Sequence, residues 1–361
     1  MSDPNRPLRI VLVAEWLDTR GAVSISIDLA RQLQMRGHSV LFLYPGGPRL
    51  SEVEETGADV LPYLPPGSVR IGSLIPRRTL LEVRDFRPDL VHALGLGAVP
   101  GAAALVRRGE APLVVTVHGW PREETARLEE GGPLPAKVVA ISQTVRESLV
   151  NRGGVPWDRV HVVEIGVDLR RIEEQSLDVE KPYDPVAGCV GPLEEWRGYQ
   201  YFVEAAPAIL AENPRARLLV AGDGLEERPL RARIRELGLE DRVLFVGGLA
   251  SYLPVFAELD VFVYPSLEEG LGQNILMAMA SGKPVVATSV GGIYRMVEDG
   301  KTGLLVRPRD PVALAGAVNR LLADRALAAS MGRAGRRVAE ERYSITRVVD
   351  ETEEIYRAVT A

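Results

Sequence analysis

The stretch 261–282 carries the residue types and the spacing best suited to chemistry. Four strand-forming residues, Val261–Tyr264, lead to two glutamates, a Gly270-Leu271-Gly272 turn and a helix-like run. A strand, a glycine turn and a helix form a phosphate site when the first helical amides point into a crevice at the strand's carboxyl end. Such turns also contain glycine for purely steric reasons, so both interpretations stay open at this point.

Glu269 makes the phosphate interpretation more specific. A carboxylate near a helix N-terminus can simply complement the helix macrodipole. Beside a bound pyrophosphate it would be repelled, so Glu269 is better suited to accept hydrogen bonds from hydroxyls on a group attached to that phosphate. A sugar nucleotide has this layout.

Four further residues have the chemistry of a binding site, each with a plainer alternative. Arg197, in the segment GPLEEWRG, offers a planar guanidinium that suits a diphosphate but is also common as a solvated loop side chain. Gly222 and Gly21 sit where a backbone could approach a phosphate or merely turn. His118 follows the run PLVVTV, where it is either a structural hydrogen-bonding residue or part of a site at a strand's carboxyl end.

Composition limits the class of protein. A chain of 361 residues is long enough for two domains, and its net charge of −6 argues against a dedicated nucleic-acid binder. Cys189 is the only cysteine and the four histidines lie far apart, so no metal site and no resident cofactor are expected. The N-terminal residues lack a secretory pattern and no apolar run is long enough to span a bilayer, so the sequence predicts a cytoplasmic protein.

The elements that must position these residues alternate between strands and helices. The first half predicts strands at Leu8–Ala14, Val40–Leu43, Asp59–Leu64, Leu90–Leu94, Leu113–Val117 and Val138–Ile141, with a helix from about Ala22 to Gly37. The second half predicts strands at Val186–Val190, Arg217–Ala221, Val243–Val246, Val261–Tyr264, Val285–Thr288 and Leu304–Val306, a helix capped at Asp310, and closing helices at Arg325–Glu341 and Ile345–Ala361. Alternation of this kind predicts parallel, doubly wound sheets.

Domain boundaries follow from the same pattern. Residues 1–170 form one Rossmann-like domain, the charged and helix-poor segment Asp168–Pro185 is a linker, and residues 186–340 form a second such domain. Residues 70–84 combine Arg70, Arg77, Arg78 and Arg84 with apolar side chains, which suits either an ordinary amphipathic helix or a patch resting on an anionic membrane.

With these residues placed, the chain resembles the retaining GT-B glycosyltransferases of glycosyltransferase family 4. The resemblance covers nearly the whole chain and rests mainly on LLVAGDG (218–224), RVLFVG (242–247), DVFVYPSLEEGLGQNIL (260–276), AMASGKPVVATSVGGI (278–293) and DGKTGLLV (299–306), with RIVLVAEW and VVTVHG in the first half. It implies an α/β protein of two Rossmann-like domains facing a cleft, metal-independent, with a C-terminal helix at 341–361 that packs back on the first domain.

The resemblance also assigns roles to matching residues. His118 would lie beside the donor sugar, and Glu269 would hold its hydroxyls. The turn and helix start at Gly270, Leu271, Gly272, Gln273 and Asn274 would face sugar and phosphate, together with Gly222. Arg197 replaces the family's diphosphate lysine, and Gly21 matches half of a family glycine pair.

Three positions depart from the family pattern. Met277 stands where a glutamate would grip the ribose, Pro192 replaces an arginine, and Ile165 replaces an asparagine. Losing a ribose contact of this type would cost about 1–3 kcal/mol of binding.

Two functions therefore remain open. The first is a retaining, hexosyltransferase-type enzyme that moves a sugar from a UDP- or GDP-linked donor, in preference to an ADP-linked one, to a hydroxyl acceptor. That acceptor is a glycan or a lipid-linked glycan of surface polysaccharide or glycolipid synthesis. The enzyme itself is expected to be cytoplasmic, with peripheral contact at the inner membrane face. The alternative is a weakened relative that binds a nucleotide, glycan or partner protein without transfer.

Overall fold

The computed structural model describes residues 6–17, 21–63, 75–106, 111–118, 135–175, 184–247, 249, 252–269 and 272–361. The chain divides into two compact units. The first comprises residues 1–166 and 345–361, and the second comprises residues 167–344. The final helix therefore belongs to the first unit although it follows the second in sequence.

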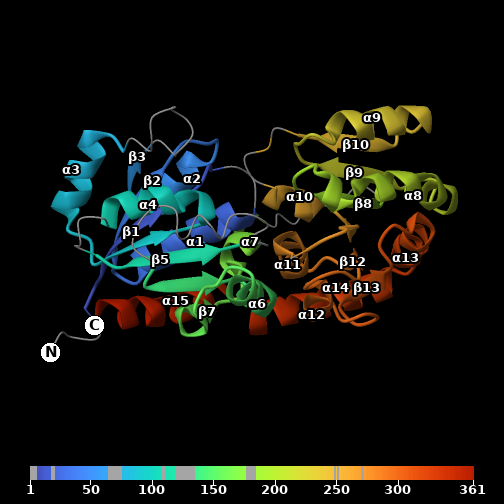
Figure 1. Ribbon diagram of the computed structural model, residues 1–361. Coiled ribbons are helices and arrows are strands. Elements are labelled where there is room, and N and C mark those ends of the chain that lie inside the picture. The colour runs from blue at the N-terminus through green and yellow to red at the C-terminus, as the bar shows by residue number, and fades with distance from the viewer. Residues whose placement is uncertain are drawn as a thin grey trace. The chain divides into compact units, whose positions relative to one another are not determined.

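The described strands of the first unit form a parallel sheet in the order β3-β2-β1-β4-β5-β6-β7. They are β1 (Arg9–Val13), β2 (Ser39–Tyr44), β3 (Asp59–Pro62), β4 (Leu90–Ala93), β5 (Leu113–Val117), β6 (Lys137–Ala140) and β7 (Val160–Val162). Central strands such as β4 and β5 are buried at every position, as expected when helices cover both faces. Figure 1 shows these strands and the surrounding helices.

Helices of the first unit follow the strands in alternation. They are α1 (Gly21–Met35), α2 (Leu50–Glu54), α3 (Arg77–Phe86), α4 (Val99–Val106), α6 (Gln143–Asn151) and α15 (Ile345–Thr360), with short 3-10 helices η1 (Leu96–Ala98) and η2 (Trp157–Arg159). Helix α15 buries Val349 and Tyr356 completely in the core of this unit, which attaches the end of the chain to it.

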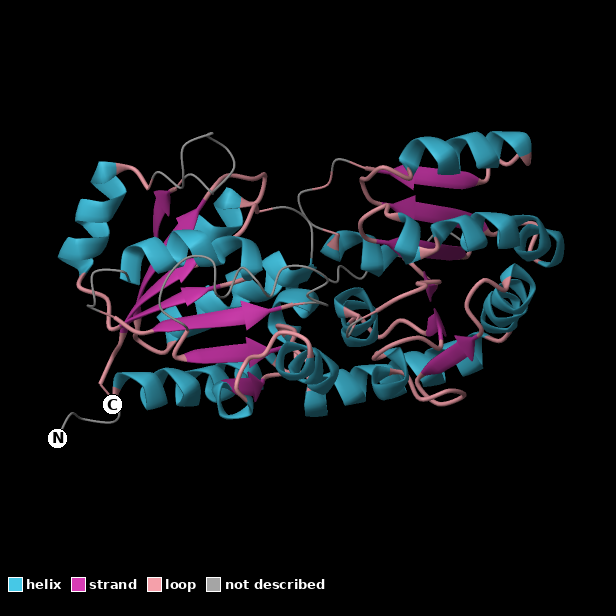
Figure 2. Cartoon of the chain, viewed as in Figure 1, coloured by secondary structure: helices cyan, strands magenta, loops and turns pink. Residues whose placement is uncertain are grey.

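The second unit repeats the design with the strand order β10-β9-β8-β11-β12-β13. Its strands are β8 (Val186–Val190), β9 (Arg217–Ala221), β10 (Val243–Val246), β11 (Val261–Tyr264), β12 (Val285–Thr288) and β13 (Gly303–Val306). Its helices are α7 (Leu169–Gln175), α8 (Tyr199–Glu212), α9 (Glu227–Glu236), α10 (Leu253–Glu258), α11 (Gln273–Ala280), α12 (Ile293–Met296), α13 (Pro311–Ala323) and α14 (Arg325–Arg342), with the 3-10 helix η3 (Glu195–Arg197). Strands and helices alternate in both units (Figure 2).

Each strand predicted from apolar runs is present within a residue or two of its expected bounds, and the predicted cap at Asp310 is confirmed. The Asp310 carboxylate accepts a hydrogen bond of 2.9 Å from the amide of Ala313, and Pro311 occupies the first helical position. The edge strand β7 was not predicted, because only three residues pair and the polar His161 interrupts the apolar run.

The prediction of a helix-poor linker from Asp168 is wrong over its first part. Helix α7 begins there because the Asp168 carboxylate accepts hydrogen bonds from the amides of Arg170 and Arg171, at 3.1 and 3.4 Å. Ile172 is then buried, and α7 packs on α10 within the second unit. Over the described residues, no helix combines the length and the apolar character needed to cross a bilayer.

Candidate functional site

The direction of chain progression in the second sheet reverses between β8 and β11. Chain progression runs outward in one direction from β8 through β9 to β10, and in the other from β11 through β12 to β13. At such a reversal the loops leaving the two central strands diverge, and ligands bind beyond the carboxyl ends of the strands. Arg197 follows β8 and Glu269 follows β11, so the fold brings both to this position.

Arg197 and Glu269 form an ion pair at that position. Arg197 Nη1 donates to Glu269 Oε2 at 2.7 Å, and the side chains are only 14% and 11% exposed. The hydroxyl of Tyr264, the last residue of β11, donates to the same carboxylate oxygen. Glu269 Oε2 is thus held from two directions, by a cation and by a buried phenol.

Aromatic rings fix the guanidinium of Arg197. Its Cζ lies 4.0 Å from the centroid of the Trp196 ring and 5.3 Å from that of Tyr264. The backbone amide of Leu267 donates to the carbonyl oxygen of Trp196 at 2.8 Å, which joins the loop after β11 to η3. The cation is therefore preorganised by stacking and by backbone pairing as well as by its carboxylate partner.

The loop that carries Glu269 packs closely on a second loop at Gly291. The amide of Gly292 donates to the Glu269 carbonyl at 3.3 Å, and a Cβ added at Gly291 would overlap that same carbonyl oxygen. Gly291 also has φ of +54°, a left-handed conformation that favours glycine. Glycine at this position therefore allows the Glu269 backbone to take its place.

Helix α11 begins beside this ion pair. Gly272 is its N-cap, with φ of +81°, and as a glycine it has no side chain that could cap the first helical amides. Uncapped amides at a helix start are suited to anions. Gly270 and Leu271 lie outside the described residues. Asn274 is buried and its Nδ2 donates to the Val190 carbonyl at 2.7 Å, so its side chain joins α11 to β8.

Three polar atoms near α11 and η3 are shielded from solvent and lack a hydrogen-bond partner within the described structure. They are Arg197 Nε, the Tyr199 hydroxyl and Gln273 Oε1. Burial raises the pKa of Tyr199 well above its usual value, so this hydroxyl keeps its proton at neutral pH. Buried polar groups are normally satisfied, so this cluster is suited to complete its hydrogen bonds with a ligand or water.

Gly222 and Met277 occupy less direct positions. The Gly222 amide donates to the Val246 carbonyl at 2.8 Å, and an added Cβ would overlap the Gly191 carbonyl oxygen. Glycine at position 222 therefore allows two loops to approach closely, which is the steric role that the sequence left open beside phosphate binding. Met277 is half-buried on α11, four residues after Gln273.

The remaining predicted residues belong to the first unit. His118 directly follows β5 and is half-buried, and Gly21 is the first residue of α1. His92 is a fully buried residue of β4, the strand that pairs with β5, and its Nδ1 and Nε2 make hydrogen bonds of 2.6 and 2.7 Å with the hydroxyls of Tyr356 and Thr116. Burial, and secondarily the nearby His118, lowers the pKa of His92 to about 3.

Some residues of these sites were not found from sequence. Tyr264 and Trp196 look like ordinary strand and loop aromatics, and only the fold shows that they hold Glu269 and Arg197.

At the corresponding reversal of the first sheet, between β1 and β4, Glu15 Oε1 accepts a 2.7 Å hydrogen bond from the Gly97 amide. Among the described residues, no group of three or more His, Cys, Asp or Glu side chains is placed to hold a metal ion.

Comparison with known proteins identifies relatives of both halves of the chain. Residues 184–324 match a family model described as glycosyl transferases group 1, and residues 19–171 match one described as glycosyltransferase family 4. A D-inositol 3-phosphate glycosyltransferase from Paenarthrobacter aurescens is 32% identical over 286 residues, covering 71% of this chain and 69% of that protein. An alpha-D-kanosaminyltransferase from Streptomyces kanamyceticus is 29% identical over 234 residues. The chain spans about three fifths of the length of the first curated relatives that it matches.

Solved structures confirm the predicted fold. Anabaena HepE, determined in complex with UDP and glucose, matches with a TM-score of 0.79 at 23% identity, covering 96% of this chain and 99% of that one. Sucrose-phosphate synthase from Thermosynechococcus elongatus matches with a TM-score of 0.74 at 22% identity, covering 98% and 99%. The two parallel sheets thus have the GT-B arrangement of strands and helices.

Proposed function

Because this chain belongs to glycosyltransferase family 4, the glycosyl transferases of group 1, we propose that it transfers a sugar from a nucleotide-diphosphate donor to a hydroxyl acceptor. The observation that carries the proposal is the Arg197–Glu269 pair, which lies at the strand reversal of the second unit beside the uncapped start of α11.

These groups suit the charges of the proposed reaction. As the bond from sugar to phosphate breaks, negative charge grows on the leaving diphosphate while the anomeric carbon becomes cation-like. Arg197 and the first amides of α11 would stabilise the diphosphate, and they are in place before the reaction, which is the main source of electrostatic catalysis. Glu269 would accept hydrogen bonds from donor-sugar hydroxyls, and His118 would orient the sugar rather than act as a general base.

The finer parts of the proposal rest on family resemblance and on the relatives. Retention at the anomeric carbon, metal independence and a UDP- or GDP-linked donor follow from the resemblance, and structures of HepE in complex with UDP and with UDP-glucose support such a donor. The acceptor would be a glycan or lipid-linked glycan of surface polysaccharide or glycolipid synthesis. The nucleotide sugar is a substrate, and no resident cofactor takes part.

A donor-hydrolysis assay tests the proposal. Wild-type protein, incubated with UDP-glucose and GDP-mannose in the presence of EDTA, is expected to release nucleoside diphosphate, and proton NMR of early glycosylated product should show the anomeric configuration of the donor. Glu269→Gln should reduce release by about tenfold or more, because the charged acceptor is lost. The matched control is Glu268→Gln, which alters the exposed neighbouring carboxylate. Full release by Glu269→Gln would contradict the assigned role.

Met277 favours a second candidate, namely a relative that binds a nucleotide or glycan without transfer. The thioether of methionine cannot accept strong hydrogen bonds from ribose hydroxyls, and the side chain of Met277, half-buried on α11, has no other acceptor atom. If the nucleotide site is in use, Met277→Glu should tighten UDP or GDP binding measured by calorimetry. Tighter binding without any donor release would support this second function.

Peripheral membrane contact forms part of the proposal for residues 70–84. Residues 70–74 lie outside the described structure, while Arg77 and Arg78 begin α3 and Leu81 is 47% exposed on it. Arg78 pairs with Glu82 at 2.7 Å, as in an ordinary amphipathic helix. Flotation with anionic liposomes at low salt tests the contact, and protein that stays in solution would contradict it.

A further inference from the structure

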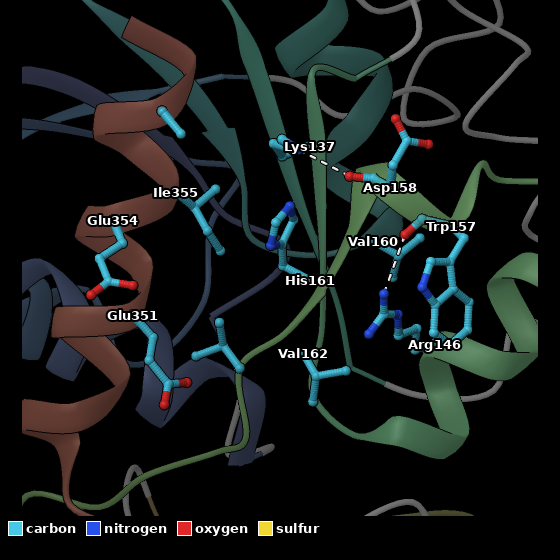
Figure 3. A pocket seen from close by; sticks show the side chains of 12 residues that line it. Lys137, Arg146, Trp157, Asp158, Val160, His161, Val162, Glu351, Glu354 and Ile355 are labelled. Carbon is cyan, nitrogen blue, oxygen red and sulfur yellow. Dashed lines mark hydrogen bonds between the residues drawn. The ribbon is translucent and has the colours of Figure 1, made fainter. Parts of the chain in front are cut away.

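A pocket in the first unit lies apart from the residues assigned to sugar transfer. Its volume is about 430 Å³, and it opens around the edge strand β7, between β6, η2, α6 and α15. Figure 3 shows its lining, which consists of Lys137, Arg146, Trp157, Asp158, Val160, His161, Val162, Val163, Glu351, Glu354, Ile355 and Ala358.

Two cations of this pocket have no carboxylate partner among the described residues. Lys137 Nζ donates to the backbone oxygen of Asp158 at 2.9 Å, and Arg146 Nη2 donates to that of Trp157 at 3.4 Å. The Arg146 guanidinium also stacks 3.6 Å from the centroid of the Trp157 ring, and Figure 3 shows the two side chains together. Both cations are thus held by neutral groups, and their charge is left for a ligand.

Two nitrogen atoms of the pocket are buried without a hydrogen-bond partner in the described structure, Arg146 Nε and His161 Nε2. Leaving a buried donor unsatisfied costs about 1–3 kcal/mol, which a bound oxygen atom would recover. Burial, followed by the nearby charges of Lys137 and Arg146, lowers the pKa of His161. Both cations therefore act electrostatically on the same imidazole.

Two of the three carboxylates of the pocket, Glu351 and Glu354, lie on the α15 wall, and the third, Asp158, lies on η2. Glu351 is paired with Arg347 at 2.9 Å, and Glu354 and Asp158 are exposed. Carboxylates in such positions can accept hydrogen bonds from hydroxyls of a ligand whose anionic end lies at Lys137 and Arg146.

We propose that this pocket binds a small organic phosphate monoester, with its phosphate held by Lys137, Arg146 and His161. These donors come from three separate elements, β6, α6 and β7, and all three line the same pocket. A tetrahedral phosphate presents three oxygens to such a set, whereas a planar carboxylate is best matched by one bidentate arginine. The volume is in the range of small-molecule pockets, about 300–1,000 Å³, so the apolar lining of Val160, Val162 and Ile355 has room for an organic body.

The test uses the full chain and glucose 1-phosphate as the probe, with inorganic phosphate and glucose as comparison ligands. Calorimetry should show tighter binding of glucose 1-phosphate than of either comparison ligand. In an NMR titration of histidine-labelled protein, saturation should raise the pKa of His161, because an anion stabilises the imidazolium against Lys137 and Arg146.

Variants separate this pocket from the proposed donor site. Glucose 1-phosphate is also a fragment of the proposed donor, so these titrations use Arg197→Gln as the background, in which the proposed donor site is weakened. In that background Arg146→Gln and Lys137→Gln, if the thermal melting temperature is kept, should each weaken glucose 1-phosphate binding about tenfold or more. Arg146→Lys should retain part of the affinity. Binding already lost with Arg197→Gln alone, an unchanged pKa of His161 at saturation, or equal affinity for inorganic phosphate would each overturn the proposal. None of these outcomes depends on whether the chain transfers sugars.

Discussion

Acid should destabilise the first unit through His92. This imidazole is fully buried between the hydroxyls of Tyr356 and Thr116, and burial lowers its pKa to about 3 from an ordinary value of 6.5. The unfolded chain therefore binds a proton at a pH where the folded chain does not. Stability contributed by neutral His92 is complete above pH 6.5 and is lost as the pH falls from there toward 3.

The magnitude follows from the two pKa values. Each pH unit within this window costs about 1.4 kcal/mol, so moving from about pH 7.5 to pH 5 should remove about 2 kcal/mol from the free energy of unfolding of the first unit. That loss is a sizeable share of the total stability of an ordinary domain, about 5–15 kcal/mol. Helix α15 should loosen as well, because Tyr356 connects it to His92.

Urea unfolding followed by tryptophan fluorescence measures this effect. A Trp196→Phe background leaves the remaining tryptophans at positions of the first unit, so the signal reports on that unit. His92→Gln should unfold more easily at neutral pH but lose about 2 kcal/mol less than the His92 protein on acidification. Equal pH dependence of the two proteins would refute the reasoning.

Three other predictions concern the site and the final helix. Tyr264→Phe should lower donor hydrolysis about tenfold, because the Glu269 carboxylate loses a buried hydrogen bond. The control is Tyr63→Phe, which removes a buried hydroxyl bonded to the Ala14 carbonyl in the other unit; it should lower stability and leave hydrolysis unchanged. Gly291→Ala should reduce hydrolysis and cost about 1–3 kcal/mol of stability. Gly300 also has a positive φ, but a Cβ added there meets no other atom, so Gly300→Ala should leave hydrolysis unchanged. Equal activity of the two variants would contradict the packing argument. Burial alone would raise the pKa of Glu353, but hydrogen bonds and charge from Arg36 and His38 outweigh burial and lower this pKa. Glu353→Gln should therefore lower the melting temperature fully above pH 4.5, and this difference should shrink as the pH falls further below 4.5.

Much of the fold could be predicted because parallel strands covered on both faces leave a strong pattern. Runs such as Val261–Tyr264 and Leu113–Val117 are apolar at nearly every position, and turn residues separate them. The prediction of secondary structure failed where a short segment or a single polar contact decides the structure. Helix α7 depends on one carboxylate cap at Asp168, and the edge strand β7 is too short for its pattern to be visible.

The candidate site was predictable in part. Arg197 and Glu269 were assigned to the same ligand from residue type and family resemblance, but their direct ion pair depends on the order of strands in the sheet, which a sequence pattern does not specify. The same holds for Tyr264, which lies at the end of a strand pattern and differs from its neighbours only by a hydroxyl. The roles of His118, Gly21, Gln273 and the other donor-site residues stay predictions.

Calorimetric titration with UDP, GDP and ADP tests the central claim most directly, namely that Arg197 binds the diphosphate of a donor. Wild-type protein is expected to bind UDP or GDP, and Arg197→Met should weaken that binding about tenfold or more through loss of a charge-assisted hydrogen bond. Arg197→Lys should recover part of the affinity, and Arg228→Met, at an exposed arginine of the same unit, should have no effect. Undiminished binding of UDP and GDP by Arg197→Met would contradict the account.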